Sequence, residues 1–180
     1  MKLMKPEDKL QIYYHPDQGA PEIDLLILEA VFDYQIHRIR PSWYLYEVVL
    51  AINKQTGLID YSYDENNCNA RVYRNGIDES EGIAESIPRY SLDDRNRPAE
   101  FLHIVDRMRE QNGYYLELGT GPSSSLQGPV YFASFWQSPE QVMENEVSAK
   151  TIPLAVTIAA LRVLRFPNAY WQNVFKEKVA

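Results

Sequence analysis

The sequence contains few of the residues on which disulfide scaffolds and metal sites depend. Its 180 residues include one cysteine, Cys68, and three histidines. One cysteine cannot form a disulfide within the chain, so nothing favours an oxidising compartment. His15, His37 and His103 lie far apart and match no metal-binding spacing, whereas a structural zinc site needs four ligands. We therefore predict no metal and no cofactor, and we interpret His103 as a surface or half-buried side chain.

Long apolar runs and a surplus of positive charge are also absent. The longest apolar run, residues 152–161, is far shorter than the roughly 20 residues that a bilayer requires. Residues 1–15 carry charges throughout and lack the apolar segment of a signal peptide. Acidic residues outnumber basic ones 25 to 18, whereas nucleic-acid binders collect lysine and arginine on one face. We expect a cytoplasmic protein with no membrane partner and no duplex nucleic acid as partner.

The residues that are present are typical of one globular domain, with 45% hydrophobic and 24% charged. Apolar residues recur at helical spacing in three segments. Residues suited to helix ends flank them: Pro21 in a first turn, Thr151 as an N-cap and Gly113 for a left-handed C-cap. We predict helices over residues 21–32, 98–111 and 151–165. In the second helix the residues expected to point inward are Phe101, Leu102, Ile104, Val105 and Met108.

Segments rich in aromatic and β-branched residues lie between these helices and predict strands. The polar segment 53–57 has hairpin chemistry, and the small-residue segment 119–128 is expected to form the long tip of a second hairpin. Residues 43–52 predict a strand whose even-numbered positions line one face. The irregular stretch 74–98 is long enough to suggest a functional loop. Strands are expected over residues 34–39, 43–52, 58–63, 114–118 and 130–136, with a further short one at 71–73.

The order of these elements resembles that of a known family. The matching segments are residues 23–31 (IDLLILEAV), 88–93 (PRYSLD), 114–118 (YYLEL), 130–135 (VYFASF) and 149–155 (AKTIPLA). They resemble the first helix, the proline–x–tyrosine–serine–threonine–aspartate segment, the hairpin and the threonine–x–proline–x–alanine helix start of the phage ABA sandwich family. The resemblance covers residues 22–165. Leu92 stands where that family commonly has threonine, and Asp33 and Tyr34 stand where it has glycine and tryptophan.

This resemblance implies a phage-encoded α/β/α sandwich without an assigned activity. We accordingly predict an α+β fold, an α/β/α sandwich with a mainly antiparallel sheet, three main helices and a short C-terminal helix. Residues 1–166 are expected to form a single domain with a strand-rich insert at about 34–85. Residues 167–180 are expected to form a helical tail that docks or mediates self-association.

The segment after Pro88 is the main candidate for a ligand site. Arg89, Tyr90, Ser91 and Asp93 combine a guanidinium, an aromatic ring, a hydroxyl and a carboxylate, a set that could bind a nucleobase or a ribose phosphate. Serine and aspartate are also typical cap and turn residues, whose side chains bond neighbouring backbone N–H groups. Both interpretations stay open on the sequence alone.

Ser123 and Ser124 are the second part of the candidate ligand site. They lie in the small-residue segment and could offer hydroxyls and backbone N–H groups to a phosphate. Phosphate loops, however, present the anion to a helix N-terminus and often add a lysine. Here a strand follows and no lysine is near, so the alternative is a flexible hairpin tip.

No set of side chains in the sequence is typical of an active site, so we predict a protein that is not an enzyme. The leading hypothesis is a phage accessory protein in the cytoplasm of the infected bacterial host. It would sequester a small nucleotide-derived ligand of anti-phage immunity, and we expect it to be a homo-oligomer. The alternative is a protein–protein inhibitor or adaptor that uses the tail and the 43–63 hairpin, and the third hypothesis is a small nucleotide hydrolase.

Overall fold

The computed structural model describes residues 21–40, 47–64, 85–93, 99–122, 129–138 and 146–164. The chain divides into two units. Unit 1 combines Met1–Ile27 with Arg89–Ala180, and unit 2 is Leu28–Pro88. The division falls within helix α1 (Pro21–Ala30), so unit 2 is an insertion in the sequence of unit 1.

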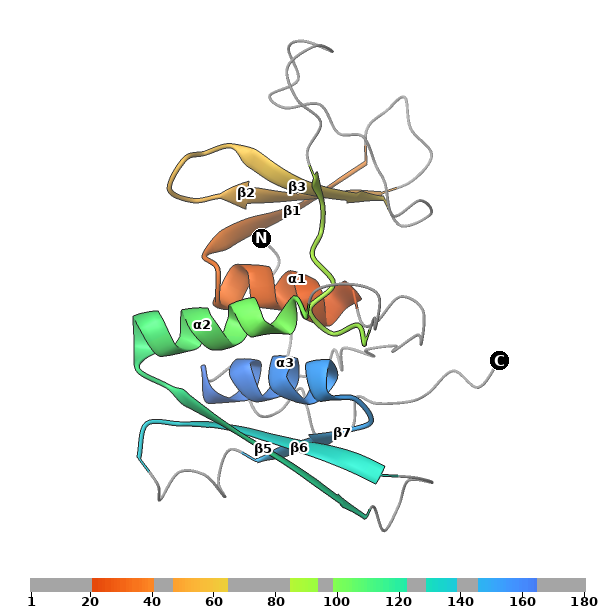
Figure 1. Ribbon diagram of the computed structural model, residues 1–180. Helices are drawn as coiled ribbons and strands as arrows, with labels where there is room; N and C mark the ends of the chain where they lie inside the picture. Colours follow the sequence, from red (N-terminus) through yellow and green to blue (C-terminus); the bar gives the residue numbers. More distant parts are fainter. Residues whose placement is uncertain are drawn as a thin grey trace, which may run out of the picture. The chain divides into compact units, whose positions relative to one another are not determined.

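Unit 1 contains a small sheet with helices packed on it. Besides the first part of α1, its elements are α2 (Phe101–Asn112), β5 (Tyr115–Pro122), β6 (Pro129–Trp136), β7 (Val147–Ala149) and α3 (Ile152–Val163). The strands are antiparallel and run in the order β5-β6-β7. Helix α3 contacts β6 and β7 as well as α2, and Figure 1 shows it between α2 and the sheet.

Helix α3 is the centre of the unit 1 core, because residues 153–161 are all buried. The sequence places apolar residues on every side of this helix, and a helix that is apolar all round has to be covered all round. Thr151 is its N-cap: its Oγ1 accepts the Leu154 N–H at 3.4 Å. Pro153 lies in the first turn, where its missing N–H leaves no helix bond unmade. The predicted N-cap and helix start are confirmed.

Helix α2 ends at the predicted glycine. Gly113 has φ of 66°, and its N–H donates to the Arg109 carbonyl at 3.0 Å, so the left-handed C-cap is confirmed. Ile104 and Met108 are buried, as predicted. The prediction for Leu102 is wrong, because this side chain is 51% exposed. Leu102 and Ile104 are two residues apart, which places them about 200° apart around the helix axis.

Strand β5 is longer than the sequence predicts. Gly119, Thr120 and Gly121 were expected in the hairpin tip, but they pair with β6 as part of the strand. The Phe132 side chain on β6 explains the extension. A Cβ added at Gly121 would lie 2.9 Å from Phe132 Cε2, and one at Gly119 would lie 3.9 Å from Phe132 Cβ. The aromatic ring therefore lies over backbone that has no side chains of its own, and supplies the packing that glycine lacks in a strand.

Unit 2 consists of the end of α1 and a four-stranded sheet. Its strands are β1 (Tyr34–Ile39), β2 (Val48–Asn53), β3 (Ile59–Asp64) and β4 (Glu85–Ser86), in the order β1-β2-β3-β4, with only β4 parallel to its neighbour. The four residues 48–51 of β2 are all buried. Both faces of this part of the strand are therefore covered, which agrees with its continuous apolar sequence.

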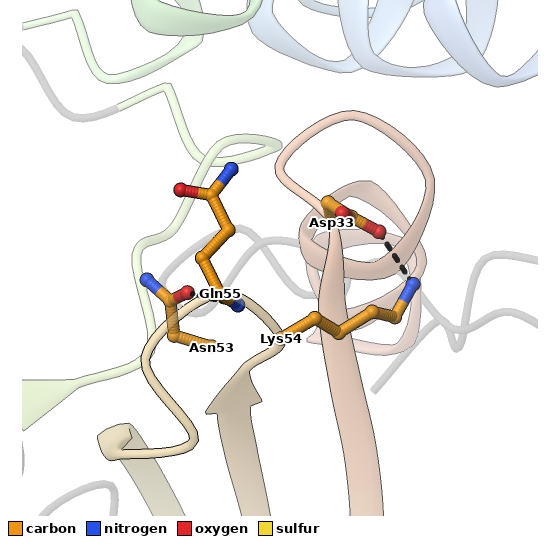
Figure 2. Close-up of polar contacts among 4 residues, drawn as sticks. All are labelled: Asp33, Asn53, Lys54 and Gln55. Carbon is orange, nitrogen blue, oxygen red and sulfur yellow. Dashed lines mark hydrogen bonds and ion pairs between the residues drawn. The ribbon is translucent and has the colours of Figure 1, made fainter.

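The hairpin between β2 and β3 follows its predicted chemistry. Asn53 Oδ1 accepts the backbone N–H of Gln55 at 2.9 Å, a contact that begins the turn shown in Figure 2. Gly57 closes the turn with φ of 70°, and its N–H donates to the Asn53 carbonyl at 2.8 Å. A left-handed φ favours glycine at this position.

The prediction of an α+β fold with three helices and mainly antiparallel strands is confirmed. The strands form two sheets, one in each unit, where the sequence analysis expected one. Strands β4 and β7 were not predicted. The predicted strand at 71–73 and the predicted tail helix at 167–180 lie outside the described residues. In the part of the chain that is described, no helix is long and apolar enough to cross a membrane.

Candidate functional site

A buried carboxylate on α1 connects two distant segments of unit 1. Asp24 is 2% exposed, although it lies in the first turn of its helix. Its Oδ1 accepts the Ser91 backbone N–H at 2.8 Å, and its Oδ2 lies 3.1 Å from the Ser91 hydroxyl. Asp24 and Ser91 are 67 residues apart, so this pair fixes the segment after Pro88 onto α1.

Burial raises the pKa of the Asp24 carboxyl well above its usual value, and the nearby carboxylate of Glu100 adds to this shift. The two Ser91 hydrogen bonds and the positive charge of Arg89 act in the opposite direction but do not cancel it. Glu100 has its own contact here, because its Oε2 accepts the Arg89 backbone N–H. A protonated Asp24 keeps both contacts: Oδ1 still accepts the N–H, and the new O–H can donate to the Ser91 oxygen.

The same segment is also bonded to α3. Thr157, which is fully buried, donates its hydroxyl to the Tyr90 carbonyl at 3.3 Å or to the Pro153 carbonyl at 2.6 Å. The Tyr90 side chain is 4% exposed. Residues 89–91 are thus attached to α1, to α3 and to Glu100 at the start of α2. They link the three helices of unit 1 through buried and half-buried polar groups.

These contacts show where the structure places the residues of the PRYSLD segment. Ser91 is fully buried and bonded to Asp24, and Tyr90 is buried as well, so neither side chain faces solvent where a small ligand would bind. The Ser91 hydroxyl bonds a side chain 67 residues away, a contact that neither interpretation predicted. Arg89 is half-buried and Asp93 is exposed, and their assignment to a ligand site stays a prediction. Ser123 and Ser124 lie outside the described residues.

A second polar cluster lies at the hairpin end of unit 2. The Asp60 Oδ2 accepts the Tyr34 hydroxyl at 2.8 Å and the Asn53 side-chain amide at 3.1 Å. The register between β2 and β3 shifts at this point, since Ala51 pairs with Tyr61 but Ile52 pairs with Ile59, which leaves Asp60 as the extra residue of a bulge. Burial, together with the bond to Asp60, raises the pKa of the Tyr34 hydroxyl.

An exposed ion pair lies beside this cluster. Lys54 Nζ contacts Asp33 Oδ1 at 2.6 Å, as Figure 2 shows. Asp33 has φ of 61°, the left-handed conformation that favours glycine. Both side chains are about half exposed, and ion pairs of this kind contribute little to stability. Among the described residues, no group of three or more histidines, cysteines or acids is placed to hold a metal ion.

The most exposed apolar side chains of the unit 1 sheet lie on β5. Tyr115 is 55% exposed and Leu118 is 46% exposed. Glu117 between them is exposed and has no hydrogen-bond or ion-pair partner in the described part of the chain. Within the described residues β5 pairs with β6 on one side only. We use the name β5 edge for this strand with its unpaired backbone side and these three side chains.

One end of the β5 edge is aromatic. The rings of Tyr115 and Trp136, which are cross-strand partners, lie 5.2 Å apart at 32°. The indole N–H of Trp136 is buried and has no hydrogen-bond partner among the described residues. Exposed aromatic side chains next to an unpaired strand are typical of recognition surfaces, because they bury a large area at a low entropic cost.

Sequence reasoning identified the PRYSLD segment but missed Asp24, which it could only assign to a helix start. It also missed the β5 edge. The signal for the edge was present, since Tyr115 and Leu118 fall on opposite faces of the predicted strand while Glu117 is its only charge. No family model matches this sequence, and the comparison found no similar curated protein and no similar solved structure.

Proposed function

We propose that this chain is a non-enzymatic binding protein and that its partner is another protein, which it contacts through the β5 edge. The observation that carries the proposal is the exposure of Tyr115 and Leu118 on a strand with one unpaired side. Apolar side chains exposed next to unpaired backbone are features of protein-binding surfaces. On the resemblance to the phage ABA sandwich family, the proposal sets this binding in a phage-infected bacterial cell.

The proposal changes the order of the hypotheses drawn from the sequence. Sequestration of a nucleotide-derived ligand depended on the side chains of residues 89–93 and on the two serines. The burial of Tyr90 and Ser91 supports an inhibitor or adaptor over that role. The surface also differs from the one first considered, because β5 takes the place of the tail and the 43–63 hairpin.

The test compares three immobilised proteins for capture from lysates of phage-infected and uninfected bacteria. They are the natural chain, the double variant Tyr115→Ser/Leu118→Ser and the control Ile39→Ser/Leu102→Ser, which removes two other exposed apolar side chains. The captured protein is then purified and its binding is measured with the three proteins in isolation. We expect binding to be lost only with the β5 variant, while all three unfold at similar temperatures.

Two results would overturn the proposal. One is a partner that binds the natural chain and the β5 variant equally well. The other is calorimetric heat with cyclic dinucleotides or ADP-ribose derivatives that vanishes on replacement of Arg89 or Asp93, because it would return the small-ligand hypothesis to first place.

A further inference from the structure

The four sheet edges of the described chain differ in how well they are protected against pairing. Natural proteins protect edges by keeping them short or by placing charged residues on them. Strands β4 and β7 are short, with two and three residues. Strand β1 has six residues but carries His37 and Arg38, the latter paired with Glu47 at 3.0 Å. Strand β5 is longer than the other three edge strands and carries one charged residue, Glu117.

Strand β5 has a regular edge. Its eight residues pair with β6 in an unbroken register, from Tyr115 opposite Trp136 to Pro122 opposite Pro129. It carries no lysine or arginine, and its one proline is its last residue. A strand of eight residues extends about 26 Å. A typical strand is about 17–20 Å long, so an added strand of that length could pair with β5 over its whole length.

The charge on this edge favours one kind of partner. Glu117 is the only charged residue of β5, it is exposed, and nothing in the described part of the chain neutralises it. Because side chains alternate along a strand, Glu117 shares a face with Tyr115, whereas Leu118 lies on the other face. Opposite charges on directly paired strands stabilise the pairing, and like charges destabilise it.

We infer that the partner supplies an extended segment that adds to β5 as a further strand, with a lysine or arginine beside Glu117. This inference rests on the proposed function and specifies its partner. A second copy of the chain fits less well. Pairing of β5 with its own copy about Glu117 would place two carboxylates opposite each other, and each chain already carries a net charge of −7.

The probes for this inference are ten-residue peptides with blocked ends, built of alternating valine and threonine with lysine, glutamine or glutamate at the centre. Their binding to the full chain is measured by fluorescence anisotropy. We expect the lysine peptide to bind about threefold to tenfold more tightly than the glutamate peptide. The variant Glu117→Lys should reverse this order. The control Glu146→Lys makes the same change of charge just before β7, on the opposite edge of the sheet, and should leave the order unchanged.

Backbone methylation separates strand addition from simple apolar contact. In an extended peptide, alternate residues direct their N–H groups to opposite edges. N-methylation of one alternate set of the lysine peptide blocks one edge and leaves the other free, whereas N-methylation of both sets blocks both edges. We expect double-edge methylation to weaken binding at least about tenfold and single-edge methylation to have a small effect, because only the free edge needs to pair.

The outcomes distinguish this inference from the proposed function. If capture of a protein requires Tyr115 and Leu118 but no peptide binds, strand addition is overturned and the proposed function stands. If the peptides bind without regard to central charge or to backbone methylation, the inferred chemistry of the partner is wrong. If sedimentation shows that the chain forms a dimer which Leu118→Pro dissociates, the occupant of the edge is a second copy and the inferred partner is wrong.

Discussion

The contact between Asp24 and Ser91 predicts that two substitutions of Asp24 change the free energy of unfolding by very different amounts. Asp24→Ala removes the acceptor for the Ser91 N–H, at 2.8 Å, and the partner of its hydroxyl, at 3.1 Å. Asp24→Asn keeps the shape of the side chain. Its Oδ1 can accept the N–H and its amide can donate to the hydroxyl oxygen, as a protonated carboxyl would.

The magnitudes follow from burial. Ser91 is fully buried, so water cannot replace the lost bonds. Leaving a buried polar group without its partner costs about 1–3 kcal/mol, and two bonds are affected. We therefore expect Asp24→Ala to lower the free energy of unfolding by about 2–5 kcal/mol. Asp24→Asn should change it by less than about 1 kcal/mol near pH 4, where the carboxyl of the natural folded chain is still protonated. Ser91→Ala, which removes the hydroxyl but not the N–H, should lie between the two.

The raised pKa of Asp24 also predicts how the stability of the chain changes with pH. Burial raises the pKa of Asp24 in the folded chain above its unfolded value of about 3.9. The folded state then holds the proton more tightly, so the stabilisation is complete below about pH 3.9 and is lost as the pH rises through the folded pKa. Its slope is at most about 1.4 kcal/mol per pH unit. Asp24→Asn has no proton to lose, so its stability relative to the natural chain should increase with pH over this window.

Urea denaturation followed by tryptophan fluorescence between pH 4 and pH 8 measures these quantities. Glu22→Gln is the matched control, because it neutralises another acid in the first turn of α1. The reasoning fails if Asp24→Asn is as destabilising as Asp24→Ala at every pH. That result would mean that the carboxylate has to be ionised to hold Ser91.

Three further predictions concern backbone conformation and can be checked by the same denaturation assay. Gly57→Ala should destabilise by about 1–2 kcal/mol, because its φ of 70° is strained for a residue with a Cβ, although the space around it is open; no change would mean that the turn adopts another conformation. Asp33→Gly should be neutral or slightly stabilising, since it removes strain at φ of 61° and loses only an exposed ion pair. Asp33→Val should instead destabilise by more than about 1 kcal/mol. Equal effects of the two substitutions would contradict the assigned φ. Gly121→Val should destabilise the chain, because the new side chain meets the Phe132 ring. In a chain that also carries Phe132→Leu, Gly121→Val should lower the free energy of unfolding by less. If the two effects simply add, the ring does not lie over this glycine.

The parts of the fold that depend on local chemistry were predictable from the sequence. Thr151 with Pro153 defines the start of α3, Gly113 the end of α2, and Asn53 with Gly57 the hairpin between β2 and β3. In each case the residues that fix the backbone lie within a few positions of one another. The helix and strand types follow for the same reason, because apolar periodicity is local.

The parts that depend on distant residues were not predictable. Asp24 has the sequence setting of a helix-start acid, and only the fold brings Ser91 against it across 67 residues. The extension of β5 through Gly119 and Gly121 depends on Phe132 of the next strand. Strand β7 has three residues, which is too short for an alternating pattern to be recognised. The local sequence of the candidate ligand segment could not reveal that Tyr90 and Ser91 are buried.

The insertion of unit 2 within the sequence of unit 1 has a consequence for biosynthesis. Asp24 and the apolar residues around it are synthesised before Leu28–Pro88, and their partners in unit 1 begin only at Arg89. At ordinary rates of translation this delay is on the order of several seconds. During that time the start of α1 has no native surface to cover it. Nascent chains stalled near residue 88, with the start of α1 outside the exit tunnel, should therefore be bound by chaperones, and they should be released once α3 has emerged.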